Sequence, residues 1–351
     1  MSSDLQIRIT DVSPRDGLQN ESAFVPTTSK LTLIAMLAGT GVDEVECTSF
    51  VSPKAIPQLA DAAEIVRAIN AIGAGRQLGV SDDAGDSAAQ AELSPAWSDF
   101  LASPSPCAFS VLVPNSRGMQ QFTDANCNPA RPLEAPPLVQ KIAVFTSASE
   151  AFCQRNIGCT IAESMARFAP VIAEAQASLL SVRGYISCIT RCPISGDVAP
   201  GEVARLAEQL LALGCDEIDL GDTIGAATPS TLRSVLDELA KVIRPGAINR
   251  LGQPMLVVHL HDTFGQAHDC VRAALQHGVR SFDSSVAGLG GCPYASTPGK
   301  PAPGNISTED LLATLTSEGF VTSVSAAKLR EAATFAMSIT RANPASSSAR
   351  V

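Results

Sequence analysis

The chain alternates eight times between a short apolar run rich in β-branched residues and a longer connecting stretch. The apolar runs lie near residues 5–12, 43–49, 108–113, 141–147, 182–188, 216–221, 255–261 and 279–285. Several connections have helical spacing, namely residues 28–37, 59–72, 161–176, 202–213 and 230–243. Because eight β/α units in series are typical of a parallel sheet closed on itself, the sequence predicts an α/β fold of the TIM (β/α)8 barrel class. Functional side chains are then expected where the strands end.

An open, doubly wound sheet is the alternative that the same alternation allows. Sheets of that kind commonly bind a dinucleotide, whose phosphates need a G-x-G-x-x-G turn after the first strand. The first predicted strand here runs into DVSPRDGLQN, residues 11–20, which lacks that turn. The nucleotide-binding form is therefore disfavoured, and the closed barrel is the main prediction.

Interruptions in the alternation set the expected domain boundaries. We assign residues 1–320 to the barrel, residues 321–342 to a C-terminal helical extension, and the Ser/Ala-rich residues 343–351 to a disordered tail. Residues 81–107 and 124–137 are expected to be surface insertions, the second carrying prolines in place of a regular helix. Residues 293–304, rich in Pro and Gly, follow the eighth strand, where a lid over the barrel mouth is expected.

The charge balance limits the partners of the chain. It has 25 Lys and Arg against 35 Asp and Glu, a formal net charge of −10, and only 4% aromatic residues. Without a basic run, the sequence disfavours nucleic acid or an anionic membrane as a partner. No apolar run approaches the ~18 residues of a membrane span. A small anionic ligand would need locally placed Arg or Lys.

The ten cysteines are irregularly spaced and do not suggest a disulfide framework. The chain begins MSSDL without a signal peptide, and a strand-like run follows where an Arg-rich transit peptide would stand. Both features predict reduced thiols and a cytoplasmic location. Cys188 and Cys192 lack the second ligand pair of a structural zinc site, which disfavours that reading of their spacing.

Two of the four histidines, His259 and His261, stand two residues apart in VVHLHDT, residues 257–263, at the end of a predicted strand. Side chains alternate between the faces of a strand, so both imidazoles point the same way, roughly 7 Å apart along the backbone. Two imidazoles on one face can bind one metal ion. A hydrogen-bonded pair of core histidines is the alternative.

Other strand ends can complete a metal site. Arg15 and Asp16 follow the first strand and Asn305 follows the eighth, so all three are expected at the mouth that His259 and His261 face. Asp16 can supply a carboxylate oxygen and Asn305 a carbonyl oxygen. Two nitrogen and two oxygen ligands suit Mg²⁺ or Mn²⁺ with open positions for substrate, with Zn²⁺ or Co²⁺ as alternatives. An Arg-Asp pair by itself is also typical of a structured turn.

Cys292 lies in a glycine-rich loop, SSVAGLGGCPY, residues 284–294, beside the same mouth. A thiol near a cation can have a depressed pKa and can transfer a proton near neutral pH. A nucleophilic role would need a neighbouring base that the sequence does not identify. An inert loop thiol is the alternative.

Five segments together closely resemble the 3-hydroxy-3-methylglutaryl-CoA lyase family, across most of residues 5–320 apart from the insertions. They are RDGLQNE (15–21), ECTSFVSPK (46–54), LGDTIG (220–225), HLHDT (259–263) and GLGGCPY (288–294). The Arg-Asp-Gly and His-x-His features are shared with a wider group of metal-dependent barrel lyases and synthases, including isopropylmalate and homocitrate synthases. The cysteine loop marks the lyase branch.

The resemblance implies a divalent ion bound by four side chains, those of Asp16, His259, His261 and Asn305. It implies that Arg15 stabilises the enolate oxygen of the thioester and that Cys292 transfers a proton. In the same way it assigns substrate contacts to Arg15, Gln19 and Glu46, catalytic roles to Asp16 and His259 as well, and structural support to Asp222. An acyl-CoA substrate and a homodimer or higher homo-oligomer are further expectations.

The reaction implied is the retro-aldol cleavage of 3-hydroxy-3-methylglutaryl-CoA to acetyl-CoA and acetoacetate, in leucine degradation or ketone-body formation. The loop between Cys292 and Asn305 is longer and richer in proline than the family pattern, so a related lyase with a different acyl chain is an alternative. A condensing synthase that runs related chemistry in reverse is another. A catalytically inactive barrel that serves as a scaffold is a third, disfavoured by the intact metal and proton-transfer positions.

Overall fold

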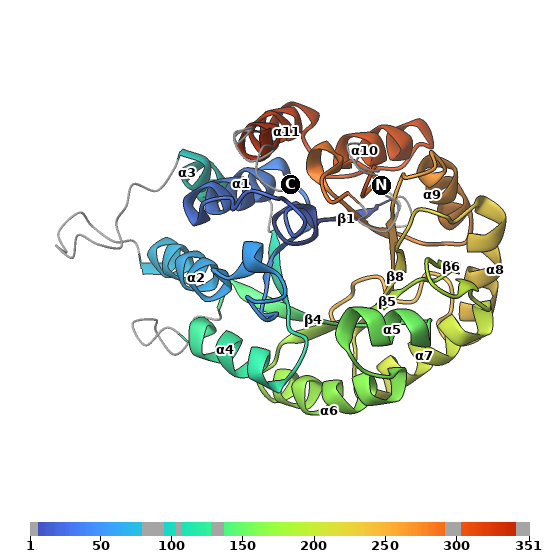
Figure 1. The fold of residues 1–351 in the computed structure, drawn as a ribbon. Coiled ribbons are helices and arrows are strands. Elements are labelled where there is room, and N and C mark those ends of the chain that lie inside the picture. Colours follow the sequence, from blue (N-terminus) through green and yellow to red (C-terminus); the bar gives the residue numbers. More distant parts are fainter. Residues whose placement is uncertain (1–5, 79–94, 103–106, 128–136, 292–302, 342–351) are drawn as a thin grey trace, which may run out of the picture.

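Eight parallel strands form a closed barrel surrounded by helices in this computed structural model (Figure 1). The structure describes residues 6–78, 95–102, 107–127, 137–291 and 303–341. The barrel order is β1-β10-β9-β8-β5-β4-β3-β2, so β1 and β10 close the ring. The predicted eight-stranded barrel is confirmed. The strands are β1 (Arg8–Asp11), β2 (Glu44–Ser49), β3 (Ala108–Leu112), β4 (Val139–Ser147), β5 (Ser181–Ser187), β8 (Glu217–Asp222), β9 (Leu256–Leu260) and β10 (Ser281–Ser284).

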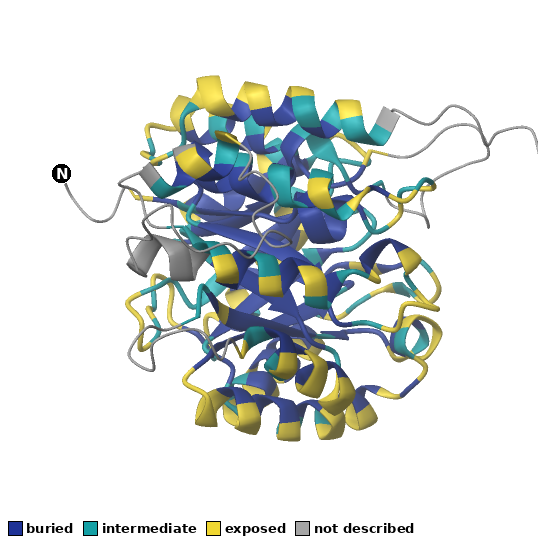
Figure 2. Ribbon diagram, turned by 90° about the vertical axis from the view of Figure 1, so that its left-hand side faces the viewer, coloured by how far each residue is buried: buried dark blue, intermediate teal, exposed yellow. Residues whose placement is uncertain are grey.

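The helices form an outer layer whose inner sides are buried and whose outer sides are exposed (Figure 2). The larger ones are α1 (Thr27–Thr40), α2 (Ala62–Leu78), α4 (Ser116–Asn126), α6 (Ile161–Ala177), α7 (Pro200–Leu213), α8 (Pro229–Leu239), α9 (Ala267–Gln276), α10 (Thr308–Ser317) and α11 (Ala326–Arg341). Shorter ones are α3 (Pro95–Ala102), α5 (Glu150–Ile157), the π-helix η2 (Ser13–Gly17), and the 3₁₀ turns η3 (Pro57–Leu59) and η4 (Val286–Gly288). Among the described residues, no helix combines the length and the apolarity needed to cross a membrane.

Local sequence explains where several of these helices begin and end. Thr160 caps α6 by accepting a hydrogen bond from the backbone N–H of Glu163, whose side chain accepts from the Thr160 backbone in return. Helix α7 begins at Pro200 and ends at Leu213. The next residue, Gly214, adopts the left-handed backbone (φ 109°) that closes many helices. Such signals fix the βα connections, and with them the strand ends that carry the site.

Part of the expected insertion at residues 81–107 is a helix that packs on the barrel. Residues 95–102 form α3, whose Trp97 and Phe100 are buried and pack edge-on to each other, with ring centroids 5.7 Å apart. Phe100 also packs against Phe109 of β3, at 5.6 Å. Apolar burial of two aromatic rings holds this segment to the barrel wall. Residues 79–94 and 103–106 lie outside the described residues.

The second expected insertion, residues 124–137, begins in the last turn of a regular helix. This helix, α4, runs from Ser116 to Asn126 with Asn115 as its N-cap. The prolines of the segment come after the last residue of α4. Residues 128–136 lie outside the described residues. Helix α11, which packs against α1, lies in the predicted C-terminal helical extension, and the predicted tail lies outside the described part.

The barrel interior contains a cluster of charged side chains below the mouth, which we call the interior cluster: Glu44, Lys141, Arg183 and Glu217. Lys141 Nζ donates to Glu44 and Glu217 at 2.6 and 2.8 Å, and Arg183 Nε donates to Glu217 at 2.5 Å. All four are at most 4% exposed. The cluster fills the interior with mutually satisfied charges, a requirement for burying charge at all.

Candidate active site

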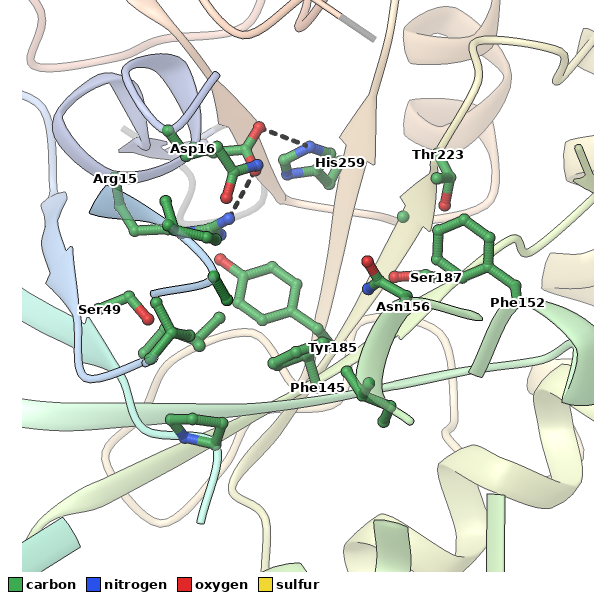
Figure 3. A pocket seen from close by; sticks show the side chains of 18 of the residues that line it. Arg15, Asp16, Ser49, Phe145, Phe152, Asn156, Tyr185, Ser187, Thr223 and His259 are labelled. Atoms are coloured by element: carbon green, nitrogen blue, oxygen red, sulfur yellow. Dashed lines mark hydrogen bonds and ion pairs between the residues drawn. The ribbon is translucent and has the colours of Figure 1, made fainter. Parts of the chain in front are cut away.

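The candidate site lies at the carboxyl ends of the strands, where β1, β9 and β10 adjoin one another in the ring. Strand β1 runs directly into the π-helix η2, which carries Arg15 and Asp16. Strand β9 carries His259, and His261 follows immediately. In Figure 3, Arg15, Asp16 and His259 point toward one another at one end of the cavity. The ends of the first and seventh strands of the barrel, β1 and β9, were expected to bring these residues together, and the structure places them side by side.

The two histidine rings face each other. Nε2 of His259 lies 3.4 Å from Nε2 of His261, and the ring centroids are 5.4 Å apart. Burial and the neighbouring His259 lower the pKa of His261 to about 4, so its imidazole is neutral at neutral pH. A neutral imidazole has a free lone pair, which is what a metal ion binds.

Asp16 completes a group of three possible ligands. One oxygen atom of Asp16 and one nitrogen atom of each histidine all lie within 4.8 Å of one another. The shortest contact between Asp16 and His259 joins Oδ2 and Nε2, at 4.0 Å. Burial opposes the charged form of Asp16, but Arg15 and the two histidines lower its pKa, so the side chain is a carboxylate. Burial opposes the charged form of His259, but Asp283 and Asp16 raise its pKa above the ordinary value. The group combines one carboxylate, one neutral imidazole and one imidazole whose proton a metal ion would displace.

A divalent ion fits this group on geometric grounds. Two nitrogen ligands that each lie about 2.1 Å from one ion are roughly 3.0–3.4 Å apart. The separation of the two Nε2 atoms, 3.4 Å, falls in that range. Nδ1 of His261 is buried without a hydrogen-bond partner among the described residues, so no protein contact there competes for the orientation of the ring.

Asn305 lies in the site, but it presents its amide nitrogen to Asp16. Nδ2 of Asn305 donates to Asp16 Oδ2 at 2.8 Å and to the carbonyl of Leu289 at 3.0 Å. A half-turn of the amide would place its oxygen where Nδ2 now lies, beside the Asp16 carboxylate that contacts His259. The close approach depends on Gly290, since a Cβ there would lie 2.5 Å from Asn305 Nδ2. The backbone bridge between His261 and Asn305 holds both residues in register.

Arg15 is buried between two carboxylates. Its Nη1 lies 2.5 Å from Asp16 Oδ1, and its Nε and Nη2 both lie 2.5 Å from Glu46 Oε2. Burial disfavours the charge of Arg15, but Glu46 and Asp16 raise its pKa above the ordinary value. The guanidinium also lies over the ring of Tyr185, 5.4 Å from its centroid. A fixed cation of this kind suits a site where negative charge develops during a reaction.

Glu46, expected to contact substrate, lies behind Arg15. It is 1% exposed and is not among the residues that line the cavity. Its geometry is that of a group that orients Arg15. Gln19, also expected to contact substrate, does line the cavity, and its Nε2 donates to Asp16 Oδ1 at 2.8 Å.

Asp222, expected to give structural support, accepts hydrogen bonds from the backbone N–H groups of Ala226 and Ala227, at 3.1 and 3.0 Å. These bonds tie the turn that follows β8. Burial raises the pKa of Asp222 to about 6. Cys292 lies outside the described residues, immediately beyond Gly291. The carbonyl of Gly291 accepts a hydrogen bond from Asn20 Nδ2 at 3.3 Å, so this end of the cysteine loop lies beside η2.

Two residues of the site were missed by the sequence interpretation. Asp283 of β10 stands directly opposite His259 of β9, and its Oδ2 lies 3.2 Å from His259 Nδ1. A carboxylate on the second ring nitrogen fixes the orientation of a metal-binding imidazole. Tyr185 of β5 places its hydroxyl 3.1 Å from Asp283 and 3.3 Å from Glu46. Side-chain alternation along the predicted strands could have pointed both residues inward.

A cavity of about 480 Å³ opens beside these residues. Figure 3 shows Tyr185 in its middle, with Arg15 and Asp16 on one side and Phe152, Ser187 and Thr223 on the other. Arg15, Asp16 and the histidines lie at one end, while the rest of the lining mixes apolar side chains such as Leu112 with polar ones such as Asn156. A cavity of this kind suits a ligand that reacts at the charged end and extends along the remainder.

Comparisons with known proteins agree on one family. A model of the HMGL-like family matches residues 133–336. The cytoplasmic 3-hydroxy-3-methylglutaryl-CoA lyase of Mus musculus is 40% identical over 329 residues, which are 94% of this chain and 80% of the mouse protein. The mitochondrial hydroxymethylglutaryl-CoA lyase of Gallus gallus is 38% identical over 330 residues, 94% of this chain and 92% of the relative.

Solved structures give the same result. An HMG-CoA lyase from Brucella melitensis superposes with a TM-score of 0.76 at 38% identity, covering 95% of this chain and 99% of that one. An HMG-CoA lyase from Acinetobacter baumannii, in complex with coenzyme A and 3-methylmalate, has a TM-score of 0.76 at 29% identity, covering 97% and 93%.

Proposed function

The chain belongs to the HMGL-like family, and from this premise we propose that it is a carbon–carbon lyase that cleaves 3-hydroxy-3-methylglutaryl-CoA to acetyl-CoA and acetoacetate. One observation carries the proposal: Arg15 lies against the group formed by Asp16, His259 and His261, at the polar end of a cavity of about 480 Å³. A cation-binding group beside a fixed guanidinium is what the cleavage of a β-hydroxy thioester requires.

Asp16, His259 and His261 would hold a divalent ion, Mg²⁺ or Mn²⁺, with the carbonyl of Asn305 as a fourth ligand after its amide turns. When bound, the ion would act as a Lewis acid that lowers the pKa of the tertiary hydroxyl of the substrate. The mixture of one carboxylate, one amide and two imidazoles supports Mg²⁺ or Mn²⁺ over a thiolate-rich zinc site.

Arg15 would bind the thioester oxygen of the substrate. As the bond between the second and third acyl carbons breaks, its electron pair moves onto the thioester, and negative charge builds on that oxygen. Glu46 and Asp16 keep Arg15 charged and hold its guanidinium in place, so no reorganisation is needed when the enolate forms. A base accepts the proton of the hydroxyl, and the departing half becomes the ketone of acetoacetate.

Cys292 would then protonate the acetyl-CoA enolate at carbon. Its loop leaves the described residues at Gly291, which Asn20 contacts at the edge of the cavity. A thiol near the site could thus deliver a proton without solvent. Gln19, which lines the cavity beside Asp16, would contact the acyl group, and Asp222 would support the wall.

The acyl-CoA substrate is supported by the relative from Acinetobacter baumannii, whose structure contains coenzyme A. We further propose that the chain is a homodimer or higher homo-oligomer and that it is cytoplasmic, as the named mouse relative is, whereas other relatives are mitochondrial. Light scattering in solution and fractionation of the source cells test these two points.

Product analysis tests the proposed reaction. Chelator-treated protein is given Mg²⁺ or Mn²⁺ and 3-hydroxy-3-methylglutaryl-CoA, and both products are quantified. We expect acetoacetate and acetyl-CoA in equal amounts, only with metal, and almost none from Cys292→Ala although that variant still binds metal. Turnover of another hydroxyacyl-CoA alone would reassign the substrate. Absence of both products with either metal would overturn the proposal.

A further inference from the structure

Cys192 lies outside the candidate active site, in a hairpin that follows β5. The hairpin pairs β6 (Arg191–Cys192) with β7 (Gly196–Asp197), and the sequence interpretation did not predict it. The side chain of Cys192 packs with Cys188 and with Phe152, and Phe152 also lines the active cavity. The thiol therefore stands next to the cavity wall without belonging to the catalytic group.

Several hydrogen-bond donors converge on the sulfur of Cys192. The hydroxyl of Ser149, the N-cap of α5, donates to Sγ at 3.0 Å. The backbone N–H groups of Ile194 and Ser195 donate to the same atom at 3.3 and 3.4 Å. Ser149 and Ser195 also hydrogen-bond each other through their hydroxyls, at 3.0 Å, which holds the donors in place. A sulfur surrounded by N–H and O–H donors is arranged for negative charge.

The pKa of Cys192 follows from this arrangement. Burial opposes the thiolate, but hydrogen bonds from Ser149, Ser195 and Ile194 lower the pKa to about 7. Burial raises the pKa of Cys188 to about 12 and that of Cys153 to about 11. Among the described cysteines whose pKa is shifted, only that of Cys192 is lowered.

A second thiol and an opening accompany the first. Cys188 belongs to the same buried cluster as Cys192 and Phe152. It adopts the left-handed backbone (φ 60°), which is uncommon for a non-glycine residue and turns the chain sharply after β5. A surface hollow of about 470 Å³ is bordered by Cys192, with the exposed side chains of Ile194 and Phe264 at its rim. Cys192 is 1% exposed, so this hollow is the side from which a small oxidant would approach the sulfur.

We propose that Cys192 and Cys188 form a peroxide-sensitive thiol pair, a modification site separate from the lyase reaction. The sulfur of Cys192 attacks one oxygen of a hydroperoxide, the O–O bond breaks, and hydroxide (or alkoxide) leaves. The thiol of Cys188 then attacks the resulting sulfenic acid, the S–O bond breaks, and the thiol proton leaves with the hydroxyl group as water. The two sulfurs lose two electrons in total, and the hydroperoxide gains them.

The disulfide would act on the cavity through its wall. The backbone N–H of Cys188 donates to Thr223 Oγ1 at 2.8 Å, and Thr223, Ser187 and Phe152 line the same side of the cavity (Figure 3). Linking Cys188 to Cys192 moves the sulfur on which Phe152 packs. Oxidation is therefore expected to lower turnover while the metal-binding group on the opposite side keeps its affinity.

Peptide mapping tests the proposal directly. Trypsin cleaves after Arg183, Arg191 and Arg205, so the two thiols fall in separate peptides, residues 184–191 and 192–205. The intact protein is treated with limiting hydrogen peroxide near pH 7, the remaining thiols are alkylated, and the digest is analysed by mass spectrometry. We expect the two peptides joined by one disulfide, released by dithiothreitol. Two separate alkylated peptides after peroxide treatment would overturn the proposal.

Three variants make the result specific. Cys188→Ser should stop at the sulfenic acid, seen as a dimedone adduct on peptide 192–205, and Cys192→Ser should give neither adduct nor disulfide. Cys153→Ser is the matched control, since Cys153 forms a similar contact with Cys159 but its pKa is raised. It should leave the linked peptides unchanged. In the unmodified chain, the rate of alkylation of Cys192 at pH 7 should exceed that of Cys153 by more than about tenfold. Equal alkylation rates of the two cysteines would contradict the proposed thiol pair. A dimedone adduct confined to other cysteines would contradict it as well.

Discussion

Two groups of charged side chains lie inside the barrel, and they differ in what surrounds them. In the interior cluster, Lys141 and Arg183 are enclosed by Glu44 and Glu217, so each charge meets an opposite one. At the mouth, Arg15 is paired in the same way, but His259 and His261 face each other with neutral or weakly basic nitrogen atoms beside a cavity. Buried charge is common to both groups, but Asp16, His259 and His261 lie beside the cavity. A second group of possible ligands among the described residues combines His259 with Asp219 and Asp283, and these two carboxylates do not line the cavity.

The comparison shows why the density of buried charge does not by itself identify a functional site. The charges of the interior cluster are compensated by its own ion pairs, and none of its four residues lines the cavity. Asp283 joins the two groups, because its carboxylate contacts Arg183 on one side and His259 on the other. The interior cluster thus holds the barrel together and also positions one residue of the mouth.

The largest expected effect is on the interior cluster. Arg183→Met should lower the free energy of unfolding by about 3–5 kcal/mol, because Glu217 and Asp283 would lose a buried counter-charge. Urea denaturation measures this. Arg272→Met is the matched control, since its ion pairs with Asp269 and Glu318 are exposed and should contribute little to stability. Equal losses of unfolding free energy in the two variants would show that the buried ion pairs stabilise the barrel no more than the exposed ones.

At the mouth, the expected effect is on turnover. Arg15→Gln should lower kcat/KM by about 10²–10³-fold, because a neutral amide stabilises the enolate oxygen less than a fixed cation does. Steady-state kinetics with saturating metal measures this. The same change at Arg191, whose pair with Asp197 is exposed on the hairpin, should leave turnover unaltered. A fully active Arg15→Gln would assign the arginine to structure alone.

A third test compares buried carboxylates with and without a cation. Arg183 and Lys141 lower the pKa of Glu44 to about 2 against the effect of burial. Asp11, which accepts hydrogen bonds from Ser13 and Thr308 but makes no salt bridge among the described residues, has a pKa raised to about 6 by burial.

A folded pKa above the unfolded value means that the stability contributed by Asp11 is present below about pH 4 and is lost as the pH rises through 6. The difference in unfolding free energy between wild type and Asp11→Asn should therefore shift against the wild type by about 2–3 kcal/mol from pH 4 to pH 7. Denaturant titrations at several pH values measure it. A difference independent of pH would show that Asp11 titrates as it does in the unfolded chain.

The smallest expected effect concerns the residue that joins the two groups. Asp283→Asn should weaken metal binding by about 10–100-fold, because the ring of His259 would lose the carboxylate that orients it. Titration with Mn²⁺ measures the affinity, and thermal unfolding of the metal-free protein checks that the barrel is intact. Unchanged affinity in a folded variant would restrict Asp283 to its contact with Arg183.

The sequence predicted the mouth better than the interior. The spacing of His259 and His261, and the positions of Asp16 and Asn305 after strand ends, follow from local rules of strand geometry and barrel topology. Asp283 and Tyr185 were missed because their roles depend on which strands adjoin across the ring, information that a single strand does not carry. Helix α3 was missed because its burial depends on Phe109, a residue that follows it in the next strand.

Glu46 shows a further limit. A motif can assign a carboxylate to a site, but whether that carboxylate contacts the ligand or the arginine beside it depends on side-chain packing across β2 and η2. Cys192 is a similar case, since its donors come from the α5 N-cap and from the tip of its own hairpin. In the sequence, its spacing from Cys188 suggested a structural zinc site, which the lack of a second ligand pair disfavoured.

The measurement that tests the central claim most directly is a Mn²⁺ titration, followed by the electron paramagnetic resonance signal of the free ion. Chelator-treated wild-type protein is compared with His259→Ala/His261→Ala and with Lys141→Met, a variant of the interior cluster. The account predicts one bound ion per chain in wild type and in any folded Lys141→Met protein, and none in the double-histidine variant at the same concentration. Equal binding by the wild type and the double-histidine variant would contradict it.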